Sequence, residues 1–331
     1  MKTLLTHGFK DIVSIDNLLS AWREFVPGKA GKKDVREFYR HLADNIISLH
    51  EELENDTYRH GGYIHFRISD PKPRDIHKAT IRDRLVHHAI YRVLYPFLSD
   101  TFIADSYSCQ LGKGTHRAIR RFRTFAGQVS RNNTQTCWIL KCDIRKFFAS
   151  IDHAILMNML SEYITDQRIN TLLREVIQSF CWQPGKGLPL GNLTSQLFVN
   201  VYMNEFDQFM KHTLKVKYYL RYADDFVVMS DNRSWLKGLI PIISNFLTVK
   251  LKLTLHPSKV FIKTLASGVD FLGWVHFPYH QVLRTSSKRR MLNRITENPE
   301  TSTMQSYLGL LQHGNAYKLA EQVINQTYLW K

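Results

Sequence analysis

The sequence of 331 residues has few cysteines, and the four that it has (Cys109, Cys137, Cys142 and Cys181) form no CxxC pair. We therefore expect neither a zinc site built on paired cysteines nor a disulfide framework, and this usage is typical of a cytoplasmic protein. The first residues, MKTLLTHGFKD, lack the uninterrupted apolar run of a signal peptide. No stretch approaches the ~18 apolar residues of a membrane helix, so no membrane partner is expected.

Acidic residues are scarce relative to basic ones. The chain has 29 Asp and Glu against 45 Lys and Arg, which gives a formal net charge of +16. An ordinary basic enzyme is one interpretation. A phosphate-rich partner is the other, because neutralising a polyanion releases its counterions. Hydrophobic residues make up 44% of the chain and charged residues 22%, which is ordinary for a globular protein of two or three packed lobes.

The first hundred residues show clear periodicities. Apolar residues at helical spacing predict a helix over 15–26, which Pro27-Gly28 ends, and a second helix with one apolar stripe over 35–53. The segment YIHFRI (63–68) alternates like a half-buried strand. Residues 80–98 are predicted to form a further helix. His87-His88 in its middle lacks other ligands at metal spacing, so we interpret this pair as packing or surface residues.

The rest of the chain alternates between strand and helix patterns. The predicted elements are a strand at 138–144, helices over 153–181, a hairpin at 217–229, a helix and then a strand over 234–256, a strand pair or bent strand at 269–277, and helices over 284–331. Between about 138 and 260 the order is β–α–β–β–α–β, which is that of a ferredoxin-like sheet. Polymerase palms have this topology, although topology alone determines no function.

Three carboxylates stand at the ends of predicted apolar strands. Asp224-Asp225 occupies the tip of the hairpin, and Asp143 ends the strand at 138–144. Adjacent carboxylates repel each other unless a positive charge offsets them. Two Mg²⁺ ions, roughly 3.5–4 Å apart, are the usual solution in phosphoryl-transfer sites. A solvated turn is the alternative for an Asp-Asp pair, and the surrounding strands argue against it.

The segment YADD at 222–225 resembles the tyrosine-x-Asp-Asp box of reverse transcriptases. KCDIRKFFASIDH, which begins at Lys141, resembles their first catalytic block. The resemblance implies that Asp143, Asp224 and Asp225 are catalytic and that, with Ile144, they form the site of two Mg²⁺ ions, for which Mn²⁺ can substitute.

The same block implies an aromatic gate five residues after its aspartate. That residue is Phe148, whose ring would clash with the 2′-OH of a ribonucleotide, so the implied product is DNA. Core packing is the alternative for Phe147-Phe148, and we expect one of the two rings to lie in the core.

Further blocks follow in the order of the family. KPRDIHKATIRDRLVHHAI (72–90) and SYSCQLGKGTHRAIRRF (106–122) resemble its two fingers blocks. LHPSKV (255–260) resembles the block whose lysine lies near the incoming triphosphate, which nominates Lys259. VDFLGWVHF (269–277) resembles the primer grip.

The resemblance thus implies an α+β fold: a right-hand polymerase with helical fingers, a ferredoxin-like palm sheet and a short helical thumb. The predicted domains are an N-terminal helical extension (1–60), fingers (61–136), a palm that includes the primer grip (137–283) and a thumb (284–331).

One loop departs from the general pattern. Most reverse transcriptases have a Gln-Gly pair beneath the templating base, whereas this chain has Leu190 to Gln196, in the form Gly-x-x-x-Ser-Gln. That form resembles the enzymes of diversity-generating retroelements, which copy a template-repeat RNA with errors at adenines. The resemblance nominates Gly191, Ser195 and Gln196 as template or nucleotide contacts. The alternative is a loop that only packs the helix that follows it.

Several basic residues are candidates for phosphate contact. Lys72 and Arg74 precede the fingers helix and are predicted to bind dNTP or template. Lys113, Arg117 and Arg121 are predicted to follow the nucleic-acid backbone, although a solvated basic face is an open alternative. Arg82 and Arg84 are weaker candidates for phosphate contact, since both can pair with acidic neighbours such as Asp83.

The predicted function is RNA-directed DNA synthesis, and error-prone copying for mutagenic retrohoming is what the resemblance adds. The implied partners are an RNA template, the RNA/DNA hybrid, dNTPs and a small basic helical accessory protein that is oligomeric. The resemblance also implies a bacterial or phage gene. A retron-, intron- or defence-associated reverse transcriptase is the alternative within the class. We expect no endonuclease or long maturase domain after the thumb, which argues against an intron protein. A catalytically idle RNA-binding protein is the alternative from another class, and the intact acids argue against it.

Overall fold

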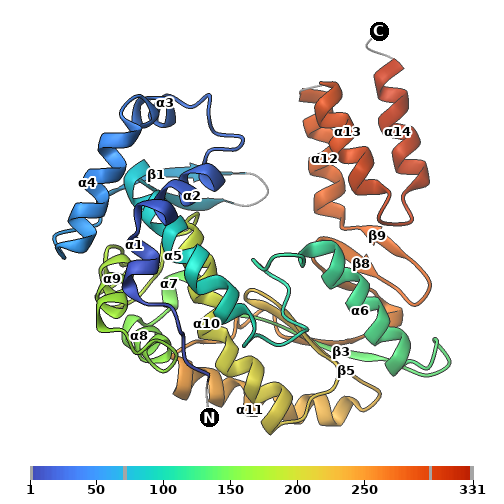
Figure 1. Cartoon of the computed structure of the whole chain (residues 1–331). Coiled ribbons are helices and arrows are strands. Elements are labelled where there is room, and N and C mark those ends of the chain that lie inside the picture. Colours follow the sequence, from blue (N-terminus) through green and yellow to red (C-terminus); the bar gives the residue numbers. More distant parts are fainter. Residues whose placement is uncertain (1–2, 70–72, 298–299, 329–331) are drawn as a thin grey trace. The chain divides into compact units, whose positions relative to one another are not determined.

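The computed structural model describes residues 3–69, 73–297 and 300–328 (Figure 1). The chain forms two compact units, and each is built from three separate segments. Unit 1 comprises Met1–Cys109, Ile144–Lys215 and Ser244–Leu255, and unit 2 comprises Gln110–Asp143, Val216–Ile243 and His256–Lys331. Among the described residues, none of the helices combines the length and apolar character needed to cross a membrane.

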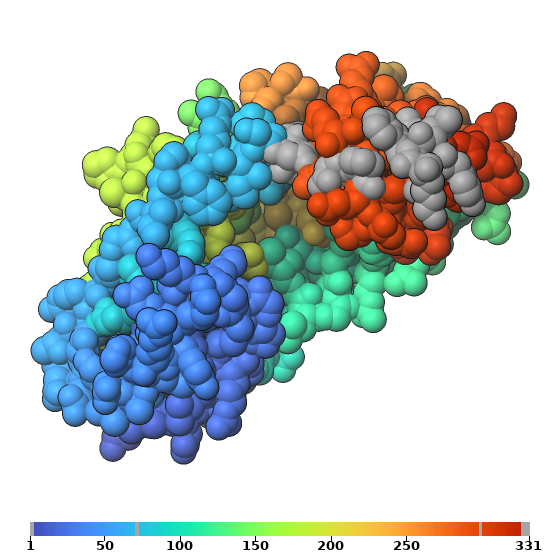
Figure 2. Space-filling model, turned by 90° about the horizontal axis from the view of Figure 1, so that it is seen from above, coloured from blue at the N-terminus to red at the C-terminus, as the bar shows by residue number. Residues whose placement is uncertain are grey.

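Unit 1 consists of helices and one hairpin. Its helices are α1 (Phe9–Val13), α2 (Ile15–Phe25), α3 (Lys33–Arg40), α4 (Leu42–Glu54), α5 (Ile81–Ser99), α7 (Phe147–Ser150), α8 (His153–Ser161), α9 (Gln167–Gln178), α10 (Leu193–Gln208) and the short π-helix η1 (Phe209–Thr213). Helix α11 (Arg233–Leu251) begins in unit 2 and ends in unit 1. Figure 2 shows the outer surface of the N-terminal helices in blue.

Helices α2 and α5 form the centre of unit 1, and both were predicted, α2 from its apolar spacing. Each begins at a hydroxyl cap, because Ser14 Oγ accepts from the Asn17 N–H (3.3 Å) and Thr80 Oγ1 accepts from the Asp83 N–H (3.2 Å). The apolar stripes of the two helices pack against each other and are buried. Burial of such stripes, more than helix propensity, stabilises helices of this length.

The single helix predicted over 35–53 is wrong in one respect, because it is divided into α3 and α4. His41 interrupts it with φ −121° and ψ 36°. The Asn45 side chain donates to the Phe38 carbonyl (3.0 Å), which gives the end of α3 a partner outside the helical ladder. Val35, Ile46 and Leu49 remain buried, so the predicted stripe still faces the core.

The strand predicted at 63–68 is confirmed, but its predicted half-burial is wrong. Strand β1 (Tyr63–Ile68) pairs antiparallel with β2 (Arg74–Ala79). Ile64, Phe66 and Ile68 are all exposed. The two-stranded sheet pairs with no further strand among the described residues, so the alternating apolar residues have no layer to cover them.

Unit 2 contains the predicted ferredoxin-like sheet. Its strands are β3 (Trp138–Asp143), β4 (Tyr219–Tyr222), β5 (Asp225–Ser230) and β6 (Phe261–Thr264), in the order β4-β5-β3-β6 with all neighbours antiparallel. The strand expected before residue 256 lies later in the chain, as β6. Helix α6 (Thr115–Val129) packs on β4 and β5. The buried side chains of β5 and α6 form the core behind the strand ends.

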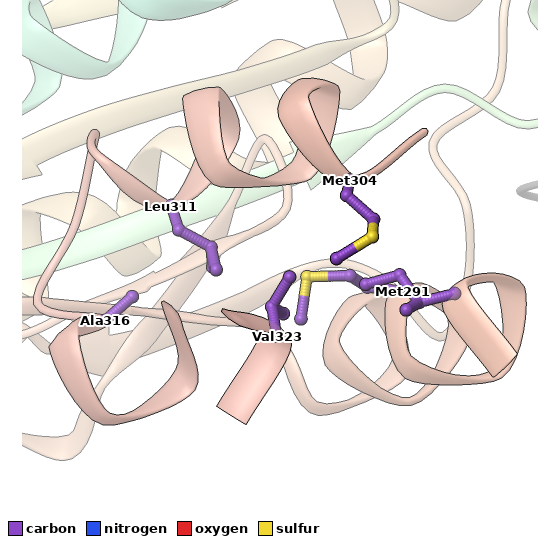
Figure 3. Close-up of a cluster of buried hydrophobic side chains, with 6 residues drawn as sticks. Met291, Met304, Leu311, Ala316 and Val323 are labelled. Atoms are coloured by element: carbon purple, nitrogen blue, oxygen red, sulfur yellow. The ribbon is translucent and has the colours of Figure 1, made fainter. Parts of the chain in front are cut away.

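A second sheet and three helices complete unit 2. The sheet consists of β7 (Val269–Phe271), β8 (Trp274–His276) and β9 (Gln281–Leu283), and the 3-10 turn η2 (Leu265–Ser267) precedes it. The helices are α12 (Thr285–Glu297), α13 (Thr301–Leu311) and α14 (Tyr317–Tyr328). Figure 3 shows their own small core, in which Met291 and Met304 meet Leu311 and Val323. This separate cluster agrees with the helical pattern predicted for the end of the chain.

Candidate active site

The antiparallel register of β3 and β5 brings two of the predicted carboxylates together. Asp143 and Asp225 are directly paired residues at the ends of these strands, and such pairs have Cβ atoms about 4.5–5.5 Å apart. Asp224 lies in the two-residue turn between β4 and β5, where Ala223 has a left-handed φ of 55°. A non-glycine residue in that conformation stores local strain of the kind found at functional sites.

A buried arginine holds this turn. Arg221 on β4 is fully buried, and its Nη1 donates to the carbonyl of Ala223 (3.1 Å). This hydrogen bond holds the backbone of the turn that carries the Asp224 carboxylate. Sequence reasoning missed Arg221, because an arginine in an apolar strand gives no sign of which backbone group it contacts.

The carboxyl group of Asp225 is in an unusual electrostatic environment. Burial raises the pKa of Asp225 to about 7; the Lys141 ammonium opposes this rise, and the charges of Asp224 and Asp143 add to it. Lys141 Nζ lies 3.1 Å from Asp225 Oδ2. Asp225 Oδ1 is buried and has no hydrogen-bond partner. One oxygen of this carboxylate is thus paired with Lys141, whereas the other is buried and has no hydrogen-bond partner.

Lys259 contacts the other strand-end carboxylate. Its Nζ lies 3.0 Å from Oδ1 and 3.1 Å from Oδ2 of Asp143. The turn that carries it is held by two backbone bonds, from His256 N to the Asp143 carbonyl (2.7 Å) and from Lys259 N to the His256 carbonyl (3.1 Å). The lysine side chain is 45% exposed. Its ammonium is therefore in a position to exchange one anionic partner for another.

The donor set of this cluster fits a divalent cation. Mg²⁺ prefers oxygen ligands and binds through one or two carboxylates plus substrate phosphates, and dedicated protein cages for it are uncommon. In the part of the chain that the structure describes, no three Asp, Glu, His or Cys side chains form a metal cage by themselves. Asp225 Oδ1 is buried and has no hydrogen-bond partner, so it is an oxygen ligand that a cation could use.

Comparison with known proteins shows the family. The model of the family described as "Reverse transcriptase (RNA-dependent DNA polymerase)" matches residues 69–276. The chain belongs to the reverse transcriptase family. Its enzymatic class is therefore RNA-directed DNA polymerase, a nucleotidyltransferase, and its partners are an RNA template and dNTPs. Members of the family use divalent metal ions, in agreement with the donor set at Asp143 and Asp225.

Individual relatives are distant. The chain is 24% identical to protein YkfC of Escherichia coli (strain K12) over 299 residues, which cover 78% of this chain and 76% of YkfC. It is 22% identical over 305 residues to the group II intron-encoded protein LtrA of Lactococcus lactis subsp. cremoris; that match covers 70% of this chain and 49% of LtrA. The chain thus spans about three quarters of one relative and about half of the other.

Solved structures support the predicted fold class. Telomerase from Candida albicans matches with a TM-score of 0.54 at 12% identity, over 82% of this chain and 54% of that chain. A truncated telomerase from Candida tropicalis matches with a TM-score of 0.51 at 14% identity, over 74% of this chain and 60% of that chain. The α+β polymerase fold of this reverse transcriptase is therefore confirmed.

In unit 1 of this reverse transcriptase, the two adjacent phenylalanines have different environments. Phe147 is buried and Phe148 is half-buried, and their rings make an edge contact with centroids 5.7 Å apart. The Phe148 carbonyl accepts from the Leu188 N–H (2.9 Å), which fixes the backbone that carries the ring. Phe147 is thus the core residue, and the Phe148 ring is the one that retains an accessible surface.

The Leu190–Gln196 loop is attached to strand β2. The His77 N–H donates to the Leu190 carbonyl (3.1 Å), and Asn192 Nδ2 donates back to the His77 carbonyl (2.9 Å). Gly191 has φ +106°, and a Cβ added to it would lie 3.0 Å from Ile76 Cγ2. Glycine is required there on both counts.

The side chains of this loop are mostly turned inward. Ser195 is buried and Gln196 is half-buried, and both lie in the first turn of α10. Asn192, which no sequence pattern had singled out, is buried and provides the bonds to β2. Arg74 is exposed on β2. Lys72 lies outside the described residues.

The predicted backbone-contact residues lie in unit 2, around the start of α6. Arg117 is exposed, whereas Arg121 is half-buried with its guanidinium 4.3 Å from the Phe125 ring centroid. Lys113 is half-buried in the glycine loop before the helix. Thr115 Oγ1 lies 3.1 Å from the hydroxyl of Tyr222, so the first residue of α6 contacts the tyrosine of the YADD box.

Arg82 and Arg84 on α5, the weaker candidates for phosphate contact, have acidic partners in the protein. Arg82 pairs with Glu52 and lies 3.5 Å from Asp83, and Arg84 lies 3.3 Å from Asp34. The packing interpretation of the double histidine is confirmed for His87, which is fully buried and whose Nε2 lies 3.1 Å from His60 Nε2.

Proposed function

We propose that this reverse transcriptase copies a template-repeat RNA with frequent errors at adenines, as part of a diversity-generating retroelement. The observation that carries the proposal is the Gly-x-x-x-Ser-Gln form of the loop that ends in Gln196. A template-side role is supported by the hydrogen bonds of Leu190 and Asn192, which join the loop to β2 of the β1–β2 hairpin. A loop of changed shape at the templating base would lower the free-energy difference between right and wrong nucleotides.

We assign two Mg²⁺ ions to Asp143, Asp224, Asp225 and Ile144, with Mn²⁺ as a substitute. When bound, these ions would lower the charge on the reacting phosphate and hold the primer 3′-oxygen for attack. The protein residues then hold the substrates around them. Lys259, which is displaceable from Asp143, is assigned to the incoming triphosphate.

Other residues are assigned by position and chemistry. We assign the accessible ring of Phe148 to the exclusion of a ribonucleotide 2′-OH. We assign support of the templating base to Gly191, Ser195 and Gln196, and contact with the nucleotide or the template to Lys72 and Arg74. We assign contact with the nucleic-acid backbone to Lys113, Arg117 and Arg121, because each cationic side chain that binds a phosphate releases counterions from the nucleic acid.

The predicted domains remain part of this proposal: an N-terminal extension (1–60), fingers (61–136), a palm with the β7–β8 hairpin as primer grip (137–283) and a thumb of α12–α14 (284–331). We further propose a bacterial or phage gene, a cytoplasmic location and a small basic helical oligomer as accessory protein. Co-purification with such a protein at moderate salt tests the last point, and its absence there contradicts it.

The error spectrum of the product decides the proposal. Purified protein, with and without the accessory protein, would extend a primer on its own repeat RNA, and the cDNA would be sequenced. We expect misincorporation opposite adenine to exceed that opposite the other bases by about tenfold or more, which corresponds to about 1.4 kcal/mol of lost discrimination. An equal error rate at all four bases would refute the retroelement assignment. The neighbouring DNA should hold two near-identical repeats that differ only where one has adenine.

A second candidate is favoured by the relatives. LtrA is encoded by a group II intron, and an intron-type enzyme would copy its RNA with an error rate independent of the template base. The same sequencing experiment therefore separates the two candidates.

A further inference from the structure

Lys141 lies two residues before Asp143 on strand β3. Because side chains alternate along a strand, the two residues share one face of the sheet. Lys141 is paired with Val227, one step along β5 from Asp225 on that face, so its side chain reaches Asp225 diagonally. The lysine is thus placed beside the catalytic carboxylates without itself being a metal ligand, since an ammonium has donors only.

The ammonium of Lys141 has two partners. It lies 3.1 Å from Asp225 Oδ2 and donates to the backbone carbonyl of Asp270 (2.9 Å). The side chain is only 14% exposed. A charge with so little access to water is retained only when it is paired and hydrogen-bonded. Both contacts are therefore expected to persist in the folded protein.

The second partner extends the link beyond the active site. Asp270 is the central residue of β7, and its Oδ2 accepts from Arg284 Nη1 (3.0 Å). The Arg284 N–H in turn donates to the Gly273 carbonyl (3.0 Å), between β7 and β8. A continuous line of contacts thus joins Asp225, Lys141, Asp270 and Arg284, all within unit 2, and it ends where α12 begins.

The contrast with Lys259 defines what is special about Lys141. Lys259 is much more exposed and donates to the carboxylate of Asp143 through both of its oxygens. Lys141 leaves one oxygen of its carboxylate untouched, and that oxygen, Asp225 Oδ1, is buried and unpartnered. The ammonium therefore pairs with Oδ2 of Asp225 and leaves Oδ1 without a hydrogen-bond partner.

We propose that Lys141 is a positioning residue for DNA synthesis. It holds Asp225 by Oδ2, leaves Oδ1 for the metal, and fixes this carboxylate relative to the β7–β8 hairpin. This inference rests on the proposed assignment of that hairpin to the primer end. Lys141 thereby couples the place of the primer 3′-end to the place of the metal. Its two partners are protein groups, so its loss should affect the rate of the chemical step and leave nucleotide binding nearly unchanged.

Three variants test the role of the ammonium. Lys141→Met removes the charge at similar length, Lys141→Arg keeps it, and Lys263→Met on β6 is the matched control, because Lys263 is an exposed lysine in the same sheet. We expect Lys141→Met to lower kcat by about 100-fold, with KM for dNTP within about threefold. Lys141→Arg should recover at least about tenfold of that loss, and Lys263→Met should stay within about twofold. Equal kcat in Lys141→Met and Lys263→Met, or a loss that appears wholly in KM, would overturn the proposal.

A double-mutant cycle tests the coupling to the hairpin and does not depend on catalysis. Lys141→Met, Arg284→Met and the double variant would bind a primer–template with 2-aminopurine at the primer 3′-end, in EDTA, and the fluorescence of the bound complex would be measured. Residues that share Asp270 should have non-additive effects, whereas Lys263→Met with Arg284→Met should be additive. Additivity in both cycles would refute the coupling.

Absence of incorporation by the wild-type protein would refute the proposed function, and the fluorescence cycle would still decide the role of Lys141.

If Lys141→Met does not fold, Lys141→Arg carries the test. An arginine variant that melts like the wild type but has lost kcat as fully as a metal-ligand variant would show that a charge at this position is not sufficient. The coupling inferred here would then be wrong.

Discussion

Replacing Asn192 with alanine should loosen the loop that carries Gly191 and Gln196. The Asn192 side chain donates to the carbonyl of His77 at 2.9 Å, and its Oδ1 lies 3.5 Å from the Ala79 N–H, so one amide bridges two backbone groups of β2. The residue is 2% exposed. Water therefore has little access to the two backbone groups once the side chain is removed.

The size of the effect follows from these contacts. An unsatisfied buried polar group costs about 1–3 kcal/mol. The His77 carbonyl loses a bond of good length, whereas the Ala79 N–H loses one at the limit of hydrogen-bond distance, so the first loss dominates. We expect about 2–3 kcal/mol in total. For a unit of about 150–250 residues, 1 kcal/mol corresponds to ~2–4 °C, so the transition of unit 1 should fall by about 4–12 °C.

Differential scanning calorimetry and primer extension measure the two consequences. Asn158→Ala is the matched control, since Asn158 is exposed on α8 in the same unit, and it should shift the transition by less than about 2 °C. The Asn192→Ala protein should also have a changed error rate, because the loop it loosens is assigned to the templating base. A shift no larger than that of the control would show that Asn192 does not anchor the loop.

Three further outcomes are expected. Phe148→Ala should reduce discrimination against ribonucleotides by about 100-fold in kcat/KM, measured by single-nucleotide insertion of dNTP against rNTP, and unchanged discrimination would remove Phe148 from the gate. Burial lowers the pKa of His87 from 6.5 to about 3, so the unfolded chain binds a proton more readily than the folded one and stability is lost as the pH falls from 6.5 towards 3. At pH 5 the loss of stability is about 2 kcal/mol relative to pH 7.5. Melting curves of the wild type and of His87→Gln at the two pH values measure it, and the variant should lack this loss. The same pH dependence in both proteins would show that His87 is not its source. Gly191→Ala should lower the melting temperature by several degrees, because its φ is +106° and the added methyl would meet Ile76, and a stable variant would show that the loop adapts freely.

Much of the fold was predictable because the decisive signals are local. The apolar spacing of α2, the strand that ends in Asp143 and the paired-acid turn all depend on residues close in sequence. The β–α–β–β–α–β order of elements along the chain predicted the ferredoxin-like sheet of β3 to β6. The break at His41 was not predictable in this way, since the apolar stripe continues through it.

The candidate site was predictable for the acids and less so for their partners. Asp143, Asp224 and Asp225 were visible as acids at the ends of apolar strands. Lys141 shares the face of Asp143 by simple alternation, so a period-2 reading of β3 could have found it. Arg221 and Asn192 could not have been found, because their partners are backbone groups, and hydrogen bonds to backbone groups carry no sequence signal. Lys259 was nominated for the triphosphate, and its bond to Asp143 became visible only in three dimensions.

One measurement tests the central claim, that these carboxylates support RNA-directed DNA synthesis. Purified protein would be given an RNA template, a DNA primer, dNTPs and Mg²⁺, beside Asp224→Asn and the matched control Asp231→Asn, which alters an exposed aspartate just after β5. We predict that the wild type and Asp231→Asn extend the primer at similar rates and that Asp224→Asn is slower by about 1,000-fold or more. Extension by Asp224→Asn at the rate of the control would contradict the account.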